Sequence, residues 1–334
     1  MIKTDRREFL ELLGFLGGSL LTGCVSFPND EEVQDYVNKS FYEKGVSFSV
    51  PVRGKSVQTH VVDLGKKDAP VIALMHGILF NSFVWRRNIE DLSKHYRVVA
   101  WDQVGSGKSE VVFPDDRVCC KYLAEHGEST LRELGIDRAH LVGHSTGGSV
   151  ASCMALHNEG LAESLTLVDS AFCFSDRKKR YFTKIVKKGN PFREYPMICI
   201  RDEAFKKYEE GHVIVPFDLR ESFAVAFRPY MYPNKCYKER QEFFYGLVES
   251  EFEKFGNYKE FLAKLDKLKP GLIYGEEDPV CDSDAVSECK RVIPSLRLFP
   301  ISGVSHFPFE EKPEEFNEVL LRATGQLEEV VEAA

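Results

Sequence analysis

Short apolar runs that each end in glycine or a polar residue constrain this chain more than any other feature. They lie at residues 70–75, 96–101, 140–142, 165–168, 271–274 and 296–301. Runs of this kind form strands that are buried on both faces of a parallel sheet. Helical stretches at 82–94, 118–134, 149–159 and 313–324 lie between or after them. The alternation predicts an α/β protein with a doubly wound, mostly parallel sheet.

Two further features complete the predicted domain, residues 46–330. The β-rich runs 46–50 and 57–64 predict a hairpin ahead of the sheet. The order of strands and helices breaks between Val168 and Leu272, in a span rich in aromatic residues and lysines. We therefore predict a mainly helical insertion at about residues 171–260, which lies as a lid over the strand ends.

Composition narrows the possible partners and cofactors. The net charge of −8 argues against a nucleic-acid partner. The nine cysteines include no CxxC pair and no Cys/His spacing typical of a metal site, so we expect no metal. Two alternatives stay open for them: disulfides, if the protein is exported, or buried free thiols.

The first 45 residues are predicted to lie outside the folded domain. A basic start with Arg6 and Arg7 precedes a short apolar run, which resembles a twin-arginine export signal over residues 1–23. The run ends in Leu-Thr-Gly-Cys, which resembles a bacterial lipobox and implies a lipid on Cys24. Residues 24–45 would then tether the domain to a membrane surface of the bacterial cell envelope. The alternative is an amphipathic N-terminal helix on a cytoplasmic protein.

The strongest chemical motif is Gly143-His144-Ser145-Thr146-Gly147, which follows one apolar strand and precedes a helical stretch. A strand that turns sharply into a helix strains the residue at the apex, and the flanking glycines leave room for neighbouring elements. The apex hydroxyl then stands at a helix N-terminus, where negative charge is favoured. We predict that Ser145 is a nucleophile; the alternative is a tight turn with a serine cap.

A serine nucleophile needs a base and an acid that orients it. His306 lies just past the last apolar strand, where a side chain can reach the cleft of a parallel sheet. Asp278 follows the strand at 271–274, and it is the predicted acid. Asp169, which follows the preceding strand, is the main rival for that role. Weaker rivals are Glu276, Glu277 and Asp282.

Acyl transfer also needs donors for the developing oxyanion. We predict the backbone N–H of Thr146, directly after the nucleophile, and that of Ile78, in the turn after the strand at 70–75. A different function is suggested by the glycine-rich segment at residues 105–109. It resembles the end of a phosphate-binding loop, with the sequence Gly105-Ser106-Gly107-Lys108-Ser109. The full phosphate-binding pattern requires glycine where this chain has Asp102, so nucleotide binding is not expected.

Taken together, these motifs resemble those of the α/β-hydrolase superfamily across residues 46 to 325. The stretches that carry the resemblance are His76-Gly77 with Trp85, Asp102 with Gly105, Gly107 and Ser109, residues 143–148, Gly275 with Asp278-Pro279, and His306-Phe307 with Glu311-Lys312-Pro313.

The resemblance implies an eight-stranded, mostly parallel sheet flanked by helices, with a lid after the sixth strand and no cofactor. It also implies hydrolysis of carboxylic esters or related small acyl substrates through an acyl-enzyme. Relatives that open epoxides carry an aspartate where this chain has Ser145, so that activity is not expected. Hydrolysis of carbon–carbon bonds, perhydrolysis, or a catalytically silent, membrane-anchored binding role stay open, as does the oligomeric state.

Overall fold

The computed structural model describes residues 40–78, 80–170, 239–240, 242–244, 246–247, 250, 258–278 and 281–325. The predicted export signal, Cys24, most of the tether and most of the predicted lid lie outside these residues. Among the described helices, none is both long and apolar enough to cross a membrane.

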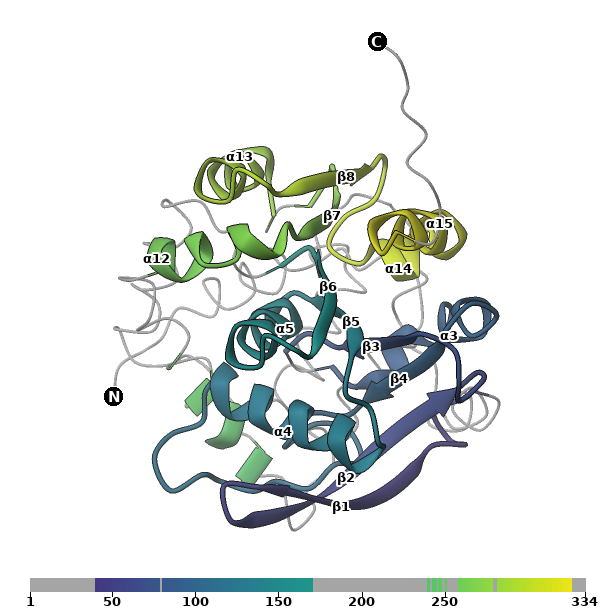
Figure 1. Ribbon diagram of the computed structural model, residues 1–334, viewed down its shortest axis with the longest axis vertical. Helices are drawn as coiled ribbons and strands as arrows, with labels where there is room; N and C mark the ends of the chain where they lie inside the picture. Colours follow the sequence, from purple (N-terminus) through teal and green to yellow (C-terminus); the bar gives the residue numbers. More distant parts are fainter. Residues whose placement is uncertain are drawn as a thin grey trace, which may run out of the picture.

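One sheet of eight strands forms the centre of the structure (Figure 1). Its strands are β1 (Val46–Val52), β2 (Lys55–Leu64), β3 (Val71–Met75), β4 (Arg97–Trp101), β5 (Ala139–His144), β6 (Ala162–Val168), β7 (Gly271–Gly275) and β8 (Arg297–Ile301). They lie in the order β1-β2-β4-β3-β5-β6-β7-β8. Strand β2 is antiparallel to both of its neighbours, and every other pairing from β4 to β8 is parallel. The predicted eight-stranded, mostly parallel sheet is confirmed.

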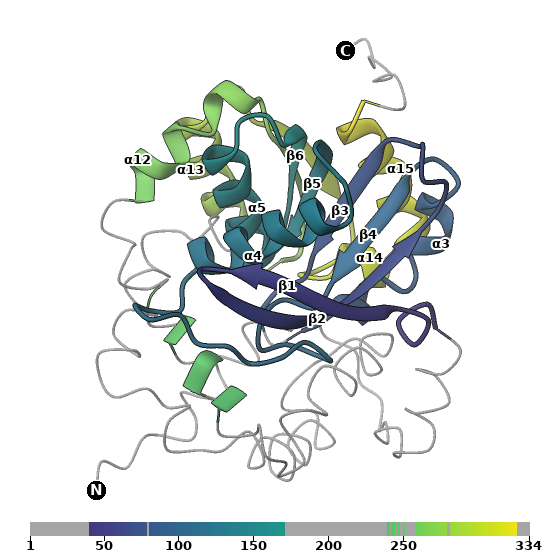
Figure 2. The same ribbon diagram turned by 60° about the horizontal axis from the view of Figure 1, so that its bottom comes forward.

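The hairpin β1–β2 forms because its two-residue turn has the required backbone conformation. Arg53 and Gly54 have φ values of 47° and 74°, and they connect the paired residues Val52 and Lys55. A two-residue turn with both φ values positive matches the right-handed twist of the strands that it joins. Figure 2 shows this hairpin at one end of the sheet.

Helices cover both faces of the sheet, because the side chains of each strand alternate between two apolar cores. Ala73 and Met75 of β3 belong to one core, and Ile72 and Leu74 belong to the other. The first core includes residues of α4 (Cys120–Glu133), α5 (Thr146–His157), α12 (Tyr258–Ala263) and α13 (Ser283–Val292). The second includes residues of the 3-10 helix η1 (Ser82–Trp85) and of α3 (Ile89–Leu92), α14 (Pro308–Glu311) and α15 (Pro313–Ala323). This is the predicted doubly wound arrangement.

The helical stretch predicted over residues 82–94 is divided in the structure into two short helices, η1 and α3. Tertiary hydrogen bonds explain the division. The backbone N–H and the hydroxyl of Ser82 both donate to Asp102 Oδ1, at 2.8 and 2.7 Å. Asn88, just before α3, donates from its side chain to Asn317 of α15 at 3.0 Å. These contacts hold the segment against β4 and α15 in a way that a regular helix would not allow.

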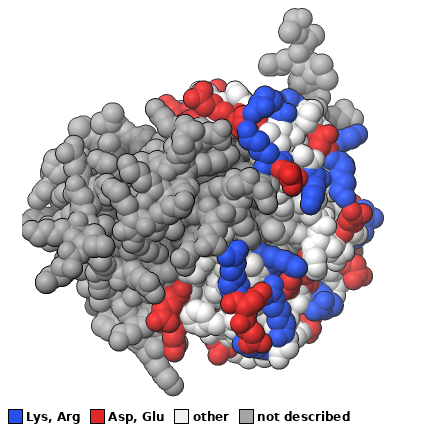
Figure 3. All heavy atoms as spheres, turned by 90° about the vertical axis from the view of Figure 1, so that its left-hand side faces the viewer, with Lys and Arg blue, Asp and Glu red and all other residues white. Residues whose placement is uncertain are grey.

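Charged side chains of both signs are interspersed on the described part of the face in Figure 3. Glu288 of α13 pairs with Lys259 at 2.9 Å and also with Arg291. Among the described cysteines, Cys153 is partly buried and the others are buried: Cys119, Cys120, Cys281 and Cys289.

Candidate active site

The predicted catalytic residues follow three strands of the parallel part of the sheet. Ser145 follows β5, Asp278 follows β7 and His306 follows β8. The carboxyl ends of parallel strands meet at one edge of a sheet, which is where open α/β sheets bind ligands. All three residues are buried, with Ser145 the most accessible at 7% exposure.

Ser145 occupies the strained apex of a strand-to-helix turn. Its φ and ψ are 51° and −119°, a conformation that costs free energy for any residue with a Cβ. Its N–H donates to Val168 O of β6 at 2.9 Å, and helix α5 begins at the next residue. Its side chain makes no capping hydrogen bond to α5, so the serine-cap alternative does not describe this turn.

Two glycines permit this turn because there is no room for a side chain. A Cβ on Gly143 would lie 2.2 Å from Gly147 O, and a Cβ on Gly147 would lie 2.4 Å from Met75 O. Both contacts are with backbone atoms, which cannot rotate away as the end of a side chain can. The start of α5 is therefore packed directly against the end of β3.

His306 and Asp278 are hydrogen-bonded to each other. The distance from His306 Nδ1 to Asp278 Oδ2 is 2.8 Å, and both side chains are almost fully buried. A carboxylate on Nδ1 holds the proton there and leaves Nε2 free to act as a base. Ser145 Oγ, by contrast, makes no hydrogen bond to His306 or to any other described residue. In proteins without bound substrate such contacts are often long, and they shorten in the reactive complex.

His144, beside the nucleophile, supports His306 in a way that the sequence did not reveal. Its Nε2 donates to the backbone carbonyl of His306 at 2.9 Å, and the two rings pack 4.9 Å apart. Burial, and then the nearby His306, lower the pKa of His144 well below its usual value. His144 is therefore a neutral side chain that ties the end of β5 to the loop after β8.

The predicted oxyanion loop is held by a second buried histidine. His76 Nε2 accepts the N–H of Gln103 at 3.0 Å, so Nδ1 carries the proton and donates to Gly77 O at 2.7 Å. The Gln103 side chain donates back to His76 O at 2.7 Å. Burial lowers the pKa of His76, which keeps the ring neutral. These bonds fix the backbone immediately before Ile78.

Ile78 and Thr146, the two predicted oxyanion donors, line the same pocket. Gly77 makes this possible, because a Cβ at that position would lie 3.3 Å from Ser145 Cβ and 2.9 Å from His144 Nδ1. Neither the N–H of Ile78 nor that of Thr146 donates to another described residue. The geometry leaves both donors available to a ligand next to Ser145.

A family model described as the alpha/beta hydrolase fold matches residues 70–187 of this chain. Among solved structures, carboxylesterase CesB from Bacillus subtilis superposes with a TM-score of 0.60 at 20% identity, over 88% of this chain and 96% of that one. The chain is an α/β-hydrolase by fold. Fold similarity at this level of identity does not assign the reaction.

Sequence relatives of this chain are hydrolases with different substrates in their names. Epoxide hydrolase 3 of Xenopus tropicalis is 24% identical over 81% of this chain and 76% of that protein. A carboxylesterase of Bacillus subtilis, itself described as uncharacterized, is 37% identical over 29% of this chain and 35% of that protein. The chain thus spans only about a third of the carboxylesterase's length. The predicted class of protein, a hydrolase, is confirmed by these relatives.

The pocket of this hydrolase has an apolar wall beside the oxyanion donors. It includes Leu123 of α4 together with Phe243, Phe244 and Leu247. The last three residues come from the span predicted to form the lid, and their side chains are buried. The pocket therefore offers an apolar surface to the part of a ligand that lies next to Thr146.

Asp102 explains the glycine-rich segment that resembled a phosphate-binding loop. Its carboxylate accepts hydrogen bonds from the Ser82 backbone and hydroxyl, from Tyr42 Oη at 2.8 Å and from the Lys108 N–H at 2.7 Å. A Cβ on Gly107 would lie 2.1 Å from Asp102 Oδ2, so only glycine fits there. The loop is thus closed around a buried carboxylate and is not open to a phosphate.

Two further acidic residues, Glu311 and Asp169, hold the backbone of loops at the site. Glu311 accepts hydrogen bonds from residues on both sides of His306. Asp169, the rival acid, is fully buried and accepts the Gly275 N–H at 3.0 Å. The motif around Glu311 was part of the family resemblance, but its contacts depend on how the loop after β8 folds back.

Proposed function

We propose that this protein is a serine hydrolase that cleaves carboxylic esters of small molecules through an acyl-enzyme. The observation that carries the proposal is the buried His306–Asp278 pair at the same edge of the sheet as a strained serine whose hydroxyl does not cap its helix. A structural serine would gain from capping α5, whereas a nucleophile must keep its hydroxyl free.

In this mechanism Ser145 Oγ attacks the ester carbonyl while His306 Nε2 takes the hydroxyl proton. Asp278 stabilises the imidazolium that forms, through the 2.8 Å bond to Nδ1. The N–H groups of Ile78 and Thr146 donate to the oxyanion, and removal of one such donor typically costs roughly a hundred- to a thousandfold in kcat. His306 then protonates the leaving alcohol and later activates the water that releases the acid.

The nucleophile supports ester hydrolysis over epoxide opening. Relatives that open epoxides resemble this chain but use an aspartate as the nucleophile. This chain has Ser145 at that position. Two of the similar proteins are named carboxylesterases, and ester hydrolysis is an acyl transfer to water. The apolar pocket wall of Leu123, Phe243 and Phe244 favours an apolar acyl or aromatic group.

We also propose that the protein is exported and anchored to a membrane surface by a lipid on Cys24, which the Leu-Thr-Gly-Cys sequence supports. Expression in a bacterium fed a labelled fatty acid tests this. Label in the wild-type protein that is lost in Cys24→Ala supports the anchor, and an unlabelled protein that retains residues 1–23 contradicts it.

Hydrolysis of chromogenic esters, from acetyl to long acyl chains, tests the reaction. Ser145→Ala should lose at least about a thousandfold in kcat, leaving only the effects of binding and the oxyanion donors. Ser152→Ala is the matched control, because its hydroxyl is buried in the same helix and has no hydrogen-bond partner among the described residues. Equal activity of wild type and Ser145→Ala, or a folded wild type that neither cleaves esters nor reacts with a fluorophosphonate, would contradict the proposal.

A further inference from the structure

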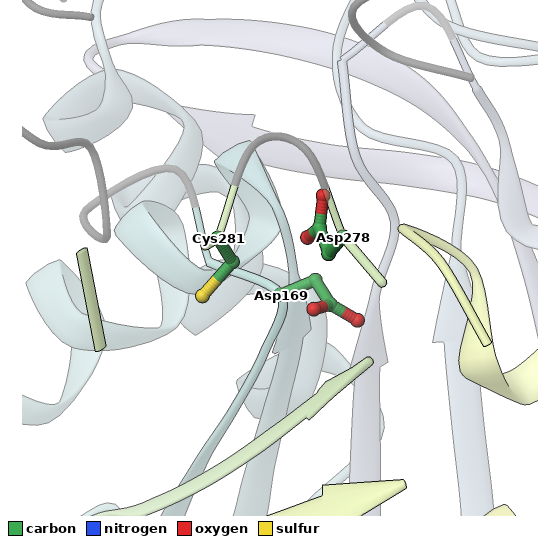
Figure 4. A group of neighbouring side chains, drawn as sticks. All are labelled: Asp169, Asp278 and Cys281. Atoms are coloured by element: carbon green, nitrogen blue, oxygen red, sulfur yellow. The ribbon is translucent and has the colours of Figure 1, made fainter. Parts of the chain in front are cut away.

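Asp169 is a second buried carboxyl group next to the proposed acid Asp278, and the mechanism above does not use it. It directly follows β6, has a φ of 40° and is completely inaccessible to solvent. Figure 4 shows its side chain beside that of Asp278, with the side chain of Cys281 to the left of both. One carboxylate oxygen of Asp169, one carboxylate oxygen of Asp278 and Cys281 Sγ lie within 4.8 Å of one another.

The contacts of Asp169 differ between its two oxygens. Oδ1 accepts the N–H of Gly275, which begins the turn that ends at Asp278. Oδ2 is buried and has no hydrogen-bond donor near it in the described part of the chain. An ionised carboxylate oxygen in that position would be desolvated without compensation, which is costly. An oxygen that carries a proton would instead need an acceptor, and the Asp278 carboxylate is the neighbouring acceptor.

Two buried carboxylates this close together do not both ionise readily, so one of them holds a proton. The contact with His306 decides which of the two carboxyl groups is ionised. His306 Nδ1 lies 2.8 Å from Asp278 Oδ2, and an N–H at that distance requires an acceptor. Asp278 is therefore the ionised partner.

The other ionisable groups around Asp169 support the same assignment. Burial, and then the charge of Asp278, raise the pKa of Asp169 well above its usual value. Glu311 of α14 adds negative charge on that side, and Cys281 contributes a thiol. His306, which can become cationic, is hydrogen-bonded to Asp278.

We propose that Asp169 is a neutral carboxylic acid whose Oδ2–H donates a hydrogen bond to the Asp278 carboxylate and thereby positions it for His306. Through Oδ1 the same side chain holds Gly275, at the start of the Asp278 turn, so one residue fixes both the loop and its carboxylate. Asp169 is a positioning residue, because it acts on His306 only through Asp278. Its effect on catalysis rests on the proposed ester hydrolysis, but its protonation state does not.

Infrared difference spectroscopy of the full chain with ¹³C-labelled aspartate tests the protonation directly. At neutral pH the wild-type spectrum should contain a protonated-carboxyl band that is missing in Asp169→Asn. This readout needs no turnover, so it remains valid if the protein proves not to be an esterase. Absence of a band that depends on Asp169 would overturn the proposal. So would a stoichiometric divalent cation in the isolated protein that is lost in Cys281→Ser, since a metal would require both carboxylates to be ionised.

The pH dependence of kcat/KM gives the second test. Asparagine copies the neutral acid, because its amide oxygen can accept from Gly275 and its N–H can donate to Asp278. We expect the acidic limb of the Asp169→Asn profile to match that of wild type. If Asp169 were ionised, removing its charge would destabilise the His306 imidazolium and move that limb down by about one pH unit or more. Such a shift would overturn the proposal.

Asp169→Ala separates positioning from a merely structural role. It removes the hydrogen bond to Asp278, so kcat should fall roughly ten- to a hundredfold with little change in KM. Asp169→Asn should restore most of that loss at a similar melting temperature. If both variants lose the same activity, or if Asp169→Ala loses none, Asp169 does not position Asp278.

Discussion

Replacing Glu311 by alanine tests how the loop that carries His306 is held in place. The Glu311 carboxylate accepts from the Ser305 N–H at 3.0 Å, from the Ser305 hydroxyl at 2.8 Å and from the Phe307 N–H at 3.2 Å. Ser305 and Phe307 are buried, so these donors lose their partner when the carboxylate is removed. Because they flank His306, the loss should affect stability and catalysis together.

The magnitude follows from these three donors. A hydrogen bond to a charged group contributes about 1.5–3 kcal/mol, and a buried donor without a partner costs about 1–3 kcal/mol. Glu311 itself is only half-buried, so water can replace part of what is lost. We therefore expect Glu311→Ala to lower the free energy of unfolding by roughly 3–4 kcal/mol, which corresponds to a melting temperature lower by about 6–16 °C. A shift of His306 by about 1 Å would lower kcat roughly a hundredfold.

Thermal unfolding and ester hydrolysis measure the two effects. Glu311→Gln keeps an acceptor oxygen and should fall between wild type and Glu311→Ala. Glu318→Ala, which removes an exposed glutamate from α15, is the control for the loss of a surface charge. If Glu311→Ala unfolds at the same temperature as Glu318→Ala and keeps its kcat, the carboxylate does not hold the His306 loop.

Two other predictions concern the turn and the response to acid. Gly147→Ala would place a Cβ 2.4 Å from Met75 O. This change should separate α5 from β3 and lower kcat/KM roughly a hundredfold. Gly160→Ala is the control, because a Cβ there would meet only Asn158 Oδ1 at 3.8 Å. Equal activity of the two variants would count against this packing. Burial lowers the pKa of His126 to about 3, so between pH 6.5 and pH 4 the unfolded chain binds a proton that the folded chain does not. The free energy of unfolding should therefore fall by roughly 3 kcal/mol over that range because of His126. In urea unfolding, the fall for His126→Gln should be smaller than that for wild type by this amount. An equal fall in the two proteins would refute the lowered pKa of His126.

The strands were predictable because their signal is local. A run such as Val71–Met75 is apolar at every position, and burial on both faces of a parallel sheet requires that composition. The turn at Ser145 was predictable for the same reason, since its glycines lie two residues away on either side. The division of the helical stretch 82–94 into two short helices was not predictable, because it depends on contacts of Ser82 with Asp102 and of Asn88 with Asn317.

Residue type and position after a strand were enough, by themselves, to predict a doubly wound, mostly parallel sheet and to nominate Ser145, His306 and Asp278. The α/β-hydrolase fold was implied by the resemblance of the motifs to that superfamily. Residue type and position left Asp169 as a rival of Asp278, because both are aspartates that follow strands of the same sheet. That choice depends on the distance to His306 Nδ1, which the chain sets only when the loops after β7 and β8 pack together. The contacts of His144, Gln103 and Glu311 likewise exist only in the folded protein, since hydrogen bonds between distant segments leave no pattern in the sequence.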